Sequence, residues 1–128
     1  MSAAIDIERI LDLARWAPSG DNVQSHEFEI LGPDHLLVHA TDTRFDCVYD
    51  LDGHPSQISF GALLETIAIA ATAQGLRTDI TRRPAREEST LQFDVRFSAD
   101  AVVAADALVA AVKSRSVQRR PMHMRPLT

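Results

Sequence analysis

A polar loop around residues 17–24 carries the first side chains in this sequence that could bind a small molecule. Pro18 fixes the backbone, and Ser19 and Asn22 then offer short polar groups that can hydrogen-bond the edge of a planar heterocycle. The same run of residues is also typical of a plain turn that ends a helix. Spacing alone leaves both interpretations open.

A second candidate group lies in the last sixteen residues, which hold five of the thirteen basic residues and no acidic one. Arginine presents a rigid fork of N–H donors that matches a phosphate, and serine adds a hydroxyl group. Arg115, Ser116 and Arg119 are therefore candidates for binding a phosphate. A solvated cationic tail without a ligand is the alternative.

Other kinds of chemistry have little support in the sequence. It contains no Gly-x-Gly-x-x-Gly segment and no Walker-type phosphate loop. His35 and His39 are four residues apart, which on a strand separates them by about 13 Å, too far to share one zinc ion. Ser19 lacks the Gly-x-Ser-x-Gly elbow of a hydrolase. We therefore expect no metal site, and the catalytic residues remain unknown.

The composition is that of an ordinary globular protein. A chain of 128 residues with 45% apolar and 24% charged residues fits one domain with a modest core. Its net charge of −5 argues against a nucleic acid partner. The lone Cys47 excludes an internal disulfide and suits a reducing compartment. With no secretion signal and no apolar run long enough for a bilayer, we expect a cytoplasmic protein without a membrane partner.

The first half of the chain predicts one helix and two strands. Apolar residues at i, i+3, i+4 and i+7 from Ile7 onward form one face of a helix, which Pro18 and Gly20 must end. Two short apolar runs around a Gly-Pro-Asp turn predict a strand pair, followed by a polar surface loop. The expected bounds are 4–16 for the helix, 27–31 and 36–40 for the strands, and 42–55 for the loop.

The second half predicts two helices and one strand. Residues 56–74 form a helix that is apolar on most sides and ends before a left-handed Gly75. Such a helix must be buried all round, so its second face is expected to pack on another subunit or domain. A half-buried strand is expected at 91–97, and a helix at 101–114 with Asp100 as its N-cap. The result is an α+β fold of order αββαβα plus a tail: a small antiparallel sheet, a central buried helix and flanking helices.

Three segments resemble the FMN-binding nitroreductase family. The first, Ala14 to Gln24, is similar to the family's loop in which a helix ends in Ala-Pro-Ser, with Asn and Gln three and five residues after the Ser. Ser25 and His26 stand where the family has Pro-Trp. This difference changes the residues that would pack beside the flavin. The resemblance implies four flavin contacts in this loop: Pro18, Ser19, Asn22 and Gln24.

The other two segments lie further along the chain. Residues 59–76 resemble the family's central helix, which lies in the dimer core. Residues 114–121 resemble the Arg-Arg-Ser-x-Arg segment that holds the FMN phosphate, with Ser114 in place of the first Arg. The resemblance implies that Arg115, Ser116 and Arg119 hold the phosphate. In the family, the loop and the phosphate segment of one site come from different subunits or halves.

The order of these segments is itself informative. In ordinary nitroreductases the phosphate segment precedes the Ala-Pro-Ser loop, whereas here it comes last. That order resembles fused members with two nitroreductase-like halves, and most of all the nitroreductase-like regions attached to bacterial ThiF-type adenylyltransferases. On this resemblance, residues 1–112 are a nitroreductase-like half-domain. Residues 113–128 are a basic tail similar to the segment that opens a second half.

The resemblance implies an FMN-dependent NAD(P)H oxidoreductase that reduces a nitro compound, a quinone or a similar acceptor. Because flavin carries the redox chemistry, the absence of an obvious catalytic side chain is consistent with this activity. The partner would be a second copy of the chain or a second nitroreductase-like half. The alternative is a non-catalytic module of a larger protein that serves assembly or sequesters flavin.

Overall fold

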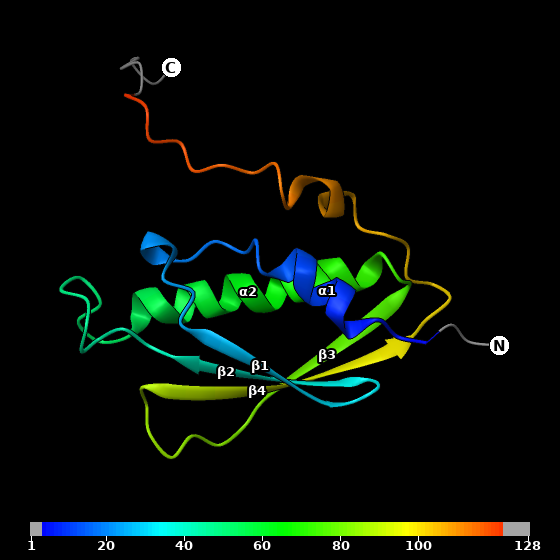
Figure 1. Ribbon diagram of the computed structural model, residues 1–128, viewed down its shortest axis with the longest axis horizontal. Helices are drawn as coiled ribbons and strands as arrows, with labels where there is room; N and C mark the ends of the chain where they lie inside the picture. The colour runs from blue at the N-terminus through cyan, green and yellow to red at the C-terminus, as the bar shows by residue number, and fades with distance from the viewer. Residues whose placement is uncertain (1–3, 122–128) are drawn as a thin grey trace, which may run out of the picture.

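Four antiparallel strands form a single sheet in the order β1-β2-β4-β3 (Figure 1). The computed structural model describes residues 4–121. Two hairpins, β1–β2 and β3–β4, meet at the centre of the sheet, where β2 pairs with β4. This confirms the expected small antiparallel sheet. The strands are β1 (His26–Gly32), β2 (His35–Thr41), β3 (Leu76–Arg82) and β4 (Thr90–Ala99).

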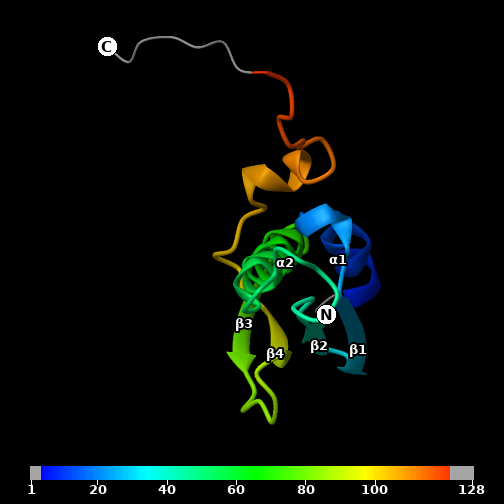
Figure 2. The ribbon, with the colours of Figure 1, turned by 90° about the vertical axis from the view of Figure 1, so that its left-hand side faces the viewer.

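Both α-helices, α1 (Ile7–Ala14) and α2 (His54–Thr72), cover the same face of the sheet (Figures 1 and 2). α1 begins where the Asp6 carboxylate accepts a hydrogen bond from Arg9 N at 2.9 Å. α2 carries a proline in its first turn, where the missing N–H would have no helical partner. The core fills the space between helices and sheet, and its most deeply buried side chains include Ile10, Leu36, Val38, Leu63, Ile67 and Val95.

The outer face of α2 is not covered by the described part of the chain around Ile58 and Gly61. Ile58 on this face is 76% exposed, and a Cβ added to Gly61 would meet no atom within 4 Å. After the helix, Gly75 has a φ of +67°, which confirms the predicted left-handed residue. No helix within residues 4–121 is long and apolar enough to span a membrane.

The strand β3 was missing from the predicted order, because sequence patterns assigned no structure to residues 76–82. Only Leu76 in this strand is buried, and the remaining side chains are exposed or half-buried. An edge strand of this kind shows little apolar–polar alternation, so periodicity gives no signal for it. Its antiparallel pairing with β4 runs from Leu76 opposite Ala99 to Arg82 opposite Phe93.

The predicted helix at 101–114 is wrong. Asp100 Oδ1 accepts a hydrogen bond from Val102 N at 3.0 Å, but it caps a single turn rather than a helix. The chain then runs extended to Asp106, whose N–H donates to Thr72 Oγ1 at 2.9 Å on α2. That tertiary bond interrupts the helical register, and only the short 3₁₀ helix η2 (Ala107–Ala111) follows. η2 lies beyond the helical layer, away from the sheet (Figure 2).

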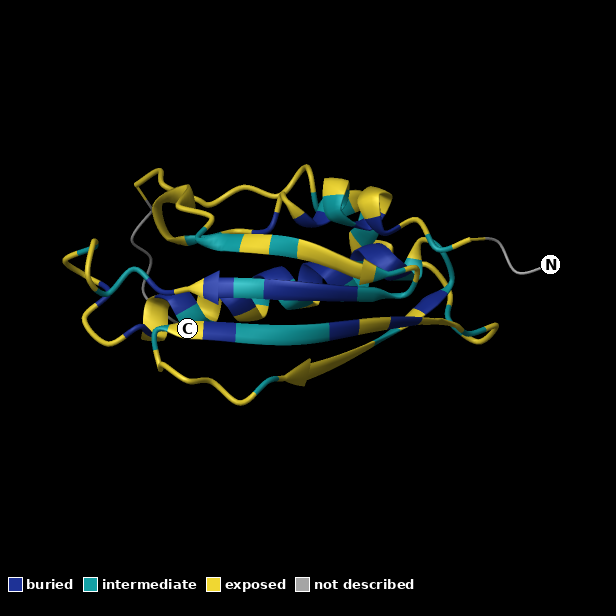
Figure 3. Cartoon of the chain, turned by 60° about the horizontal axis from the view of Figure 1, so that its bottom comes forward, coloured by how far each residue is buried: buried dark blue, intermediate teal, exposed yellow. Residues whose placement is uncertain are grey.

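The uncovered face of the sheet is polar and cross-linked by ion pairs. Asp94 accepts a hydrogen bond from Arg83 Nε at 2.6 Å and pairs with His35 Nε2 at 2.6 Å. Arg83 lowers the pKa of Asp94 to about 2, with burial opposing this effect and His35 adding to it. His39 pairs with Glu29 at 2.9 Å on the same face. Viewed from this side, the two central strands are more buried than the edge strands (Figure 3).

Candidate functional site

The two polar segments identified in the sequence line one hollow on the protein surface. Arg115 Nη2 donates a hydrogen bond to the Trp16 carbonyl oxygen at 3.0 Å, which brings the basic segment beside the loop that follows α1. Both segments belong to the same chain. We call this feature the polar hollow, and it is lined by Pro18, Ser19, Asp21, Asn22, Arg115, Val117 and Arg119.

The polar hollow contains most of the predicted site residues but not all of them. Gln24 lies outside its lining and serves inside the loop instead: its side-chain amide donates to Asn22 Oδ1 at 3.1 Å. This bond occupies the carbonyl of the Asn22 amide and leaves its NH₂ group as a donor. Ser116 is exposed and also lies outside the lining. The hollow includes one acid, Asp21, which sequence reasoning did not single out.

The loop from Ser19 to Gln24 has an unusual backbone. Asp21, Asn22 and Gln24 have φ values of +49°, +57° and +53°, in the left-handed region that glycine favours. Each such residue costs roughly 1 kcal/mol, so the surrounding contacts must hold the conformation. One of these contacts is internal, because Ser19 Oγ accepts a hydrogen bond from Gln24 N at 3.2 Å.

Two further contacts fix the loop to the body of the protein. Ser59 Oγ on α2 accepts a hydrogen bond from Gly20 N at 3.3 Å. Tyr49, from the loop between β2 and α2, donates its hydroxyl hydrogen bond to Asp21 Oδ2. The bond to Asp21 is the main reason that the pKa of Tyr49 is raised well above its usual value. Neither contact has a local signal in the sequence, since each joins residues far apart in the chain.

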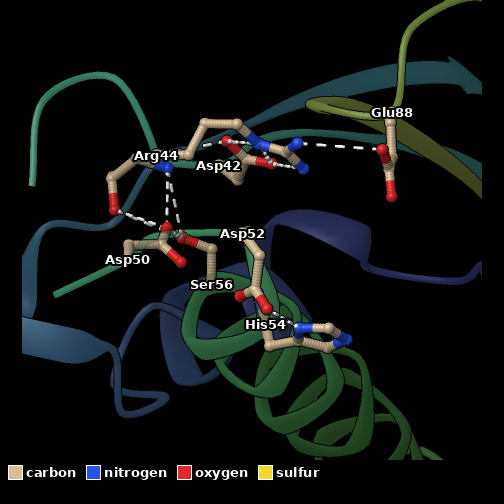
Figure 4. Close-up of polar contacts among 8 residues, drawn as sticks. Asp42, Arg44, Asp50, Asp52, His54, Ser56 and Glu88 are labelled. Carbon is tan, nitrogen blue, oxygen red and sulfur yellow. Dashed lines mark hydrogen bonds and ion pairs between the residues drawn. The ribbon is translucent and has the colours of Figure 1, made fainter.

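The residue after Tyr49, Asp50, belongs to a buried polar cluster with Thr43 and Ser56 at the start of α2. Figure 4 shows Asp50 beside Ser56. The Asp50 carboxylate is 1% exposed and accepts hydrogen bonds from Thr43 N at 3.0 Å, Thr43 Oγ1 at 2.8 Å and Ser56 Oγ at 2.5 Å. Burial acts to raise the pKa of Asp50, but the bonds from Ser56 and Thr43 outweigh it and lower the pKa. This Asp50 cluster fixes the backbone next to Tyr49.

An ion pair and a closely packed glycine lie next to the Asp50 cluster. Asp42 Oδ2 lies 2.7 Å from Arg44 Nη2, and the Asp42 side chain is almost fully buried (Figure 4). Gly53, with a φ of +84°, passes so close that an added Cβ would lie 2.5 Å from Asp42 Oδ2. A side chain at this position would therefore strain the backbone and displace the ion pair.

The basic segment is attached to the body through Trp16. Lys113 Nζ lies 5.7 Å from the Trp16 ring centroid, a cation–π geometry, and 3.7 Å from Asp12 Oδ2. Together with the Arg115 bond, these contacts close the segment against the end of α1. Arg119 lines the hollow and forms no hydrogen bond or ion pair with another residue in the range 4–121.

An apolar groove adjoins the polar hollow and shares Pro18 and Arg115 with it. Its other lining residues come from the end of α1, from α2 and from η2, and they are Trp16, Thr66, Ile69, Leu108, Ala111 and Val112. A polar, cationic region next to an apolar groove can accept a ligand that has an apolar planar part and an anionic group.

Comparisons with known proteins identify the fold. No protein-family model and no curated protein match the chain. Its structure is similar to that of a nitroreductase family protein from Clostridium novyi NT, with a TM-score of 0.57, 15% identity and coverage of 77% of each chain. It is also similar to a nitroreductase family protein from Clostridium difficile 630, with a TM-score of 0.59, 16% identity and coverage of 95% of this chain and 91% of the other. The chain therefore has a nitroreductase-like α+β fold, as its motifs predicted.

Proposed function

We propose that this chain is an FMN-binding, nitroreductase-like oxidoreductase domain. The observation that carries the proposal is the convergence of the 18–22 loop with Arg115 and Arg119 in one polar hollow beside an apolar groove. The residue types on the two sides match the two parts of the cofactor. The nitroreductase-like fold makes this ligand class the natural one to test.

The residues of the hollow divide into two roles. Ser19 and the NH₂ group of Asn22 would hydrogen-bond the flavin ring or its ribityl chain. Arg119, which has no described protein partner, and Arg115 would bind the phosphate through charge-assisted hydrogen bonds. The flavin would supply hydride transfer between NAD(P)H and a small acceptor such as a nitro compound or a quinone. The protein's contribution is to orient the ring and to neutralise the phosphate.

The partner follows from the outer face of α2. Ile58 and Gly61 leave an apolar surface on that helix without cover from residues 4–121. A second copy of the chain, or a second nitroreductase-like half as in the fused and ThiF-attached proteins, would bury it. Light scattering tests this part, and a folded monomer at micromolar concentration would contradict it. A cytoplasmic location is proposed with it, because the single thiol of Cys47 needs no oxidising compartment.

Cofactor binding is tested directly by adding FMN to the purified protein. Trp16, the only tryptophan, lies at the edge of the groove, so bound flavin should quench its fluorescence. Saturable quenching by FMN, with weaker binding of riboflavin, supports the phosphate contacts. A protein that is colourless as purified and shows no quenching with either ligand would contradict the proposal.

The second candidate function is a non-catalytic module that assembles with a partner or sequesters flavin. Its support is the pair Ser25 and His26, which stand where the family has Pro-Trp beside the flavin. An NAD(P)H oxidation assay on the FMN-loaded protein, with a quinone or nitro compound as acceptor, separates the two functions. Turnover supports the enzyme, and tight FMN binding without turnover supports the module.

A further inference from the structure

An acidic side chain in the polar hollow conflicts with the binding of an anion there. Asp21 lines the hollow together with Arg115 and Arg119. A free carboxylate at this position would repel a phosphate and would compete with it for the arginine side chains. An anion site that contains such a residue needs a group that binds the carboxylate elsewhere.

Tyr49 provides that group. Its hydroxyl donates to Asp21 Oδ2 from the loop between β2 and α2, outside the set of residues that line the hollow. Neither Arg115 nor Arg119 forms an ion pair with Asp21, although all three line one hollow.

The position of Tyr49 is fixed in turn. The residue that follows it, Asp50, is buried and binds Thr43 and Ser56 through three hydrogen bonds (Figure 4). Asp50 N also donates to Cys47 O at 3.1 Å, which closes the turn that contains Tyr49. The tyrosine hydroxyl is therefore presented to Asp21 from a rigid support, although half of the side chain is exposed to solvent.

We propose that Tyr49 is a positioning residue that selects for an anionic ligand: by binding the Asp21 carboxylate, it keeps the arginine side chains of the polar hollow available to a phosphate. This inference rests on the proposed function, because it names a determinant of the same site. Tyr49 itself would not touch the ligand. It acts only through Asp21.

The test compares three variants with wild type: Tyr49→Phe, Asp21→Asn and the double variant. FMN and riboflavin are titrated against each by quenching of the single Trp16. Tyr49→Phe should weaken FMN binding about tenfold, because it frees the carboxylate to compete for the arginines, while riboflavin binding changes less than about twofold. Asp21→Asn in the Tyr49→Phe background should restore the affinity for FMN. This rescue separates the electrostatic role from a merely structural one.

In the flavin titrations, two results would overturn the inference: unchanged FMN affinity in Tyr49→Phe, or a double variant as weak as Tyr49→Phe alone. If wild type binds neither flavin, the proposed function fails, and inorganic phosphate becomes the probe for the same four proteins. Phosphate binding that falls in Tyr49→Phe and returns in the double variant would still support the role of Tyr49. No difference among the four would refute it.

A measurement without ligand checks the contact itself. Tyr49 is the only tyrosine, so the ultraviolet absorbance of tyrosinate reports its ionisation alone. Asp21→Asn should move this titration to lower pH, since the bond to Asp21 keeps the hydroxyl protonated. Identical titrations in wild type and Asp21→Asn would show that the contact is not formed in solution, which also overturns the inference.

Discussion

The two sides of the polar hollow are built in opposite ways. The 19–24 loop has three residues in the left-handed backbone region and is held by side chains from two other parts of the chain, Ser59 and Tyr49. The basic segment from 113 to 121 is exposed at every position and is attached mainly at Trp16. One side of the site is therefore preformed, and the other is held by a few surface contacts.

This difference determines how each side would contribute to binding. A preformed loop has already lost its conformational freedom on folding, so its contacts with a ligand carry little further entropic cost. The basic segment is held by only a few contacts, so a ligand must order it further, and this ordering lowers the net affinity for the phosphate. Changes on the loop side should thus affect the stability of the protein, whereas changes in the basic segment should affect ligand affinity.

The largest effect is expected on the preformed side, in the Asp50 cluster. Asp50→Ala leaves Thr43 N and Ser56 Oγ without their acceptor in a buried place, which should lower the free energy of unfolding by about 3 kcal/mol. Chemical denaturation measures this change. Asp79→Ala, which removes an exposed contact with Arg77, is the matched control and should have no measurable effect. Equal losses in both variants would contradict the importance of the cluster.

On the basic side, Arg115→Ala should weaken FMN binding by about ten- to a hundredfold, because a charge-assisted hydrogen bond is lost. Riboflavin, which has no phosphate, should bind the variant and the wild type about equally. The free energy of unfolding should change little, since Arg115 touches the body only at the Trp16 carbonyl. Wild-type FMN affinity in this variant would show that the segment is only a cationic surface.

The next prediction concerns the ion pair of Asp94 on the open face of the sheet, which lies outside the site. The pKa of Asp94 is lowered to about 2, so its ion pair contributes stability at pH values above about 4, the ordinary range of an aspartate. This contribution, ~1–2 kcal/mol, is lost as the pH falls from about 4 through 2. Asp94→Asn should flatten the stability profile over this window. The affinity for FMN should stay unchanged in this variant. A loss of affinity would show that the open face of the sheet contributes to FMN binding.

The smallest effect is expected for Lys113→Ala. This change removes the cation from the Trp16 ring and an exposed contact with Asp12. The fluorescence emission of Trp16 should shift, while denaturation midpoints stay within experimental error. FMN affinity should fall by less than about threefold, because Lys113 does not line the hollow. A loss as large as that of Arg115→Ala would mean that the whole segment binds the phosphate as a unit.

Local patterns predicted the elements with strong periodicity. The strands β1 and β2, the helix α1, and the apolar α2 with Gly75 behind it all lie within a few residues of their expected positions. The edge strand β3 was not predicted, because its exposed side chains show no clear alternation of apolar and polar residues. The helix expected at 101–114 failed because a long-range bond from Asp106 to Thr72 overrides local helix propensity.

In the candidate site too, local patterns identified some residues and missed those that depend on long-range contacts. Pro18, Ser19, Asn22, Arg115 and Arg119 were identified from residue types and motif order, and they lie together in one hollow. Tyr49, Asp50 and Ser59 were not identified, since their roles depend on contacts that span 28 to 39 positions or on a buried cluster. The family resemblance implies that the loop and the basic segment of one site come from different subunits or halves, whereas the structure brings the two segments of one chain together.

The bond between Arg115 and the Trp16 carbonyl joins residues that are 99 positions apart. Contacts with such a large separation require closure of almost the entire chain, and they form late because the loop entropy must be overcome before they contribute. We therefore expect the sheet and both helices to be in place before the basic segment docks. In stopped-flow refolding, the Trp16 fluorescence should report this docking as a phase that follows the main recovery of secondary structure.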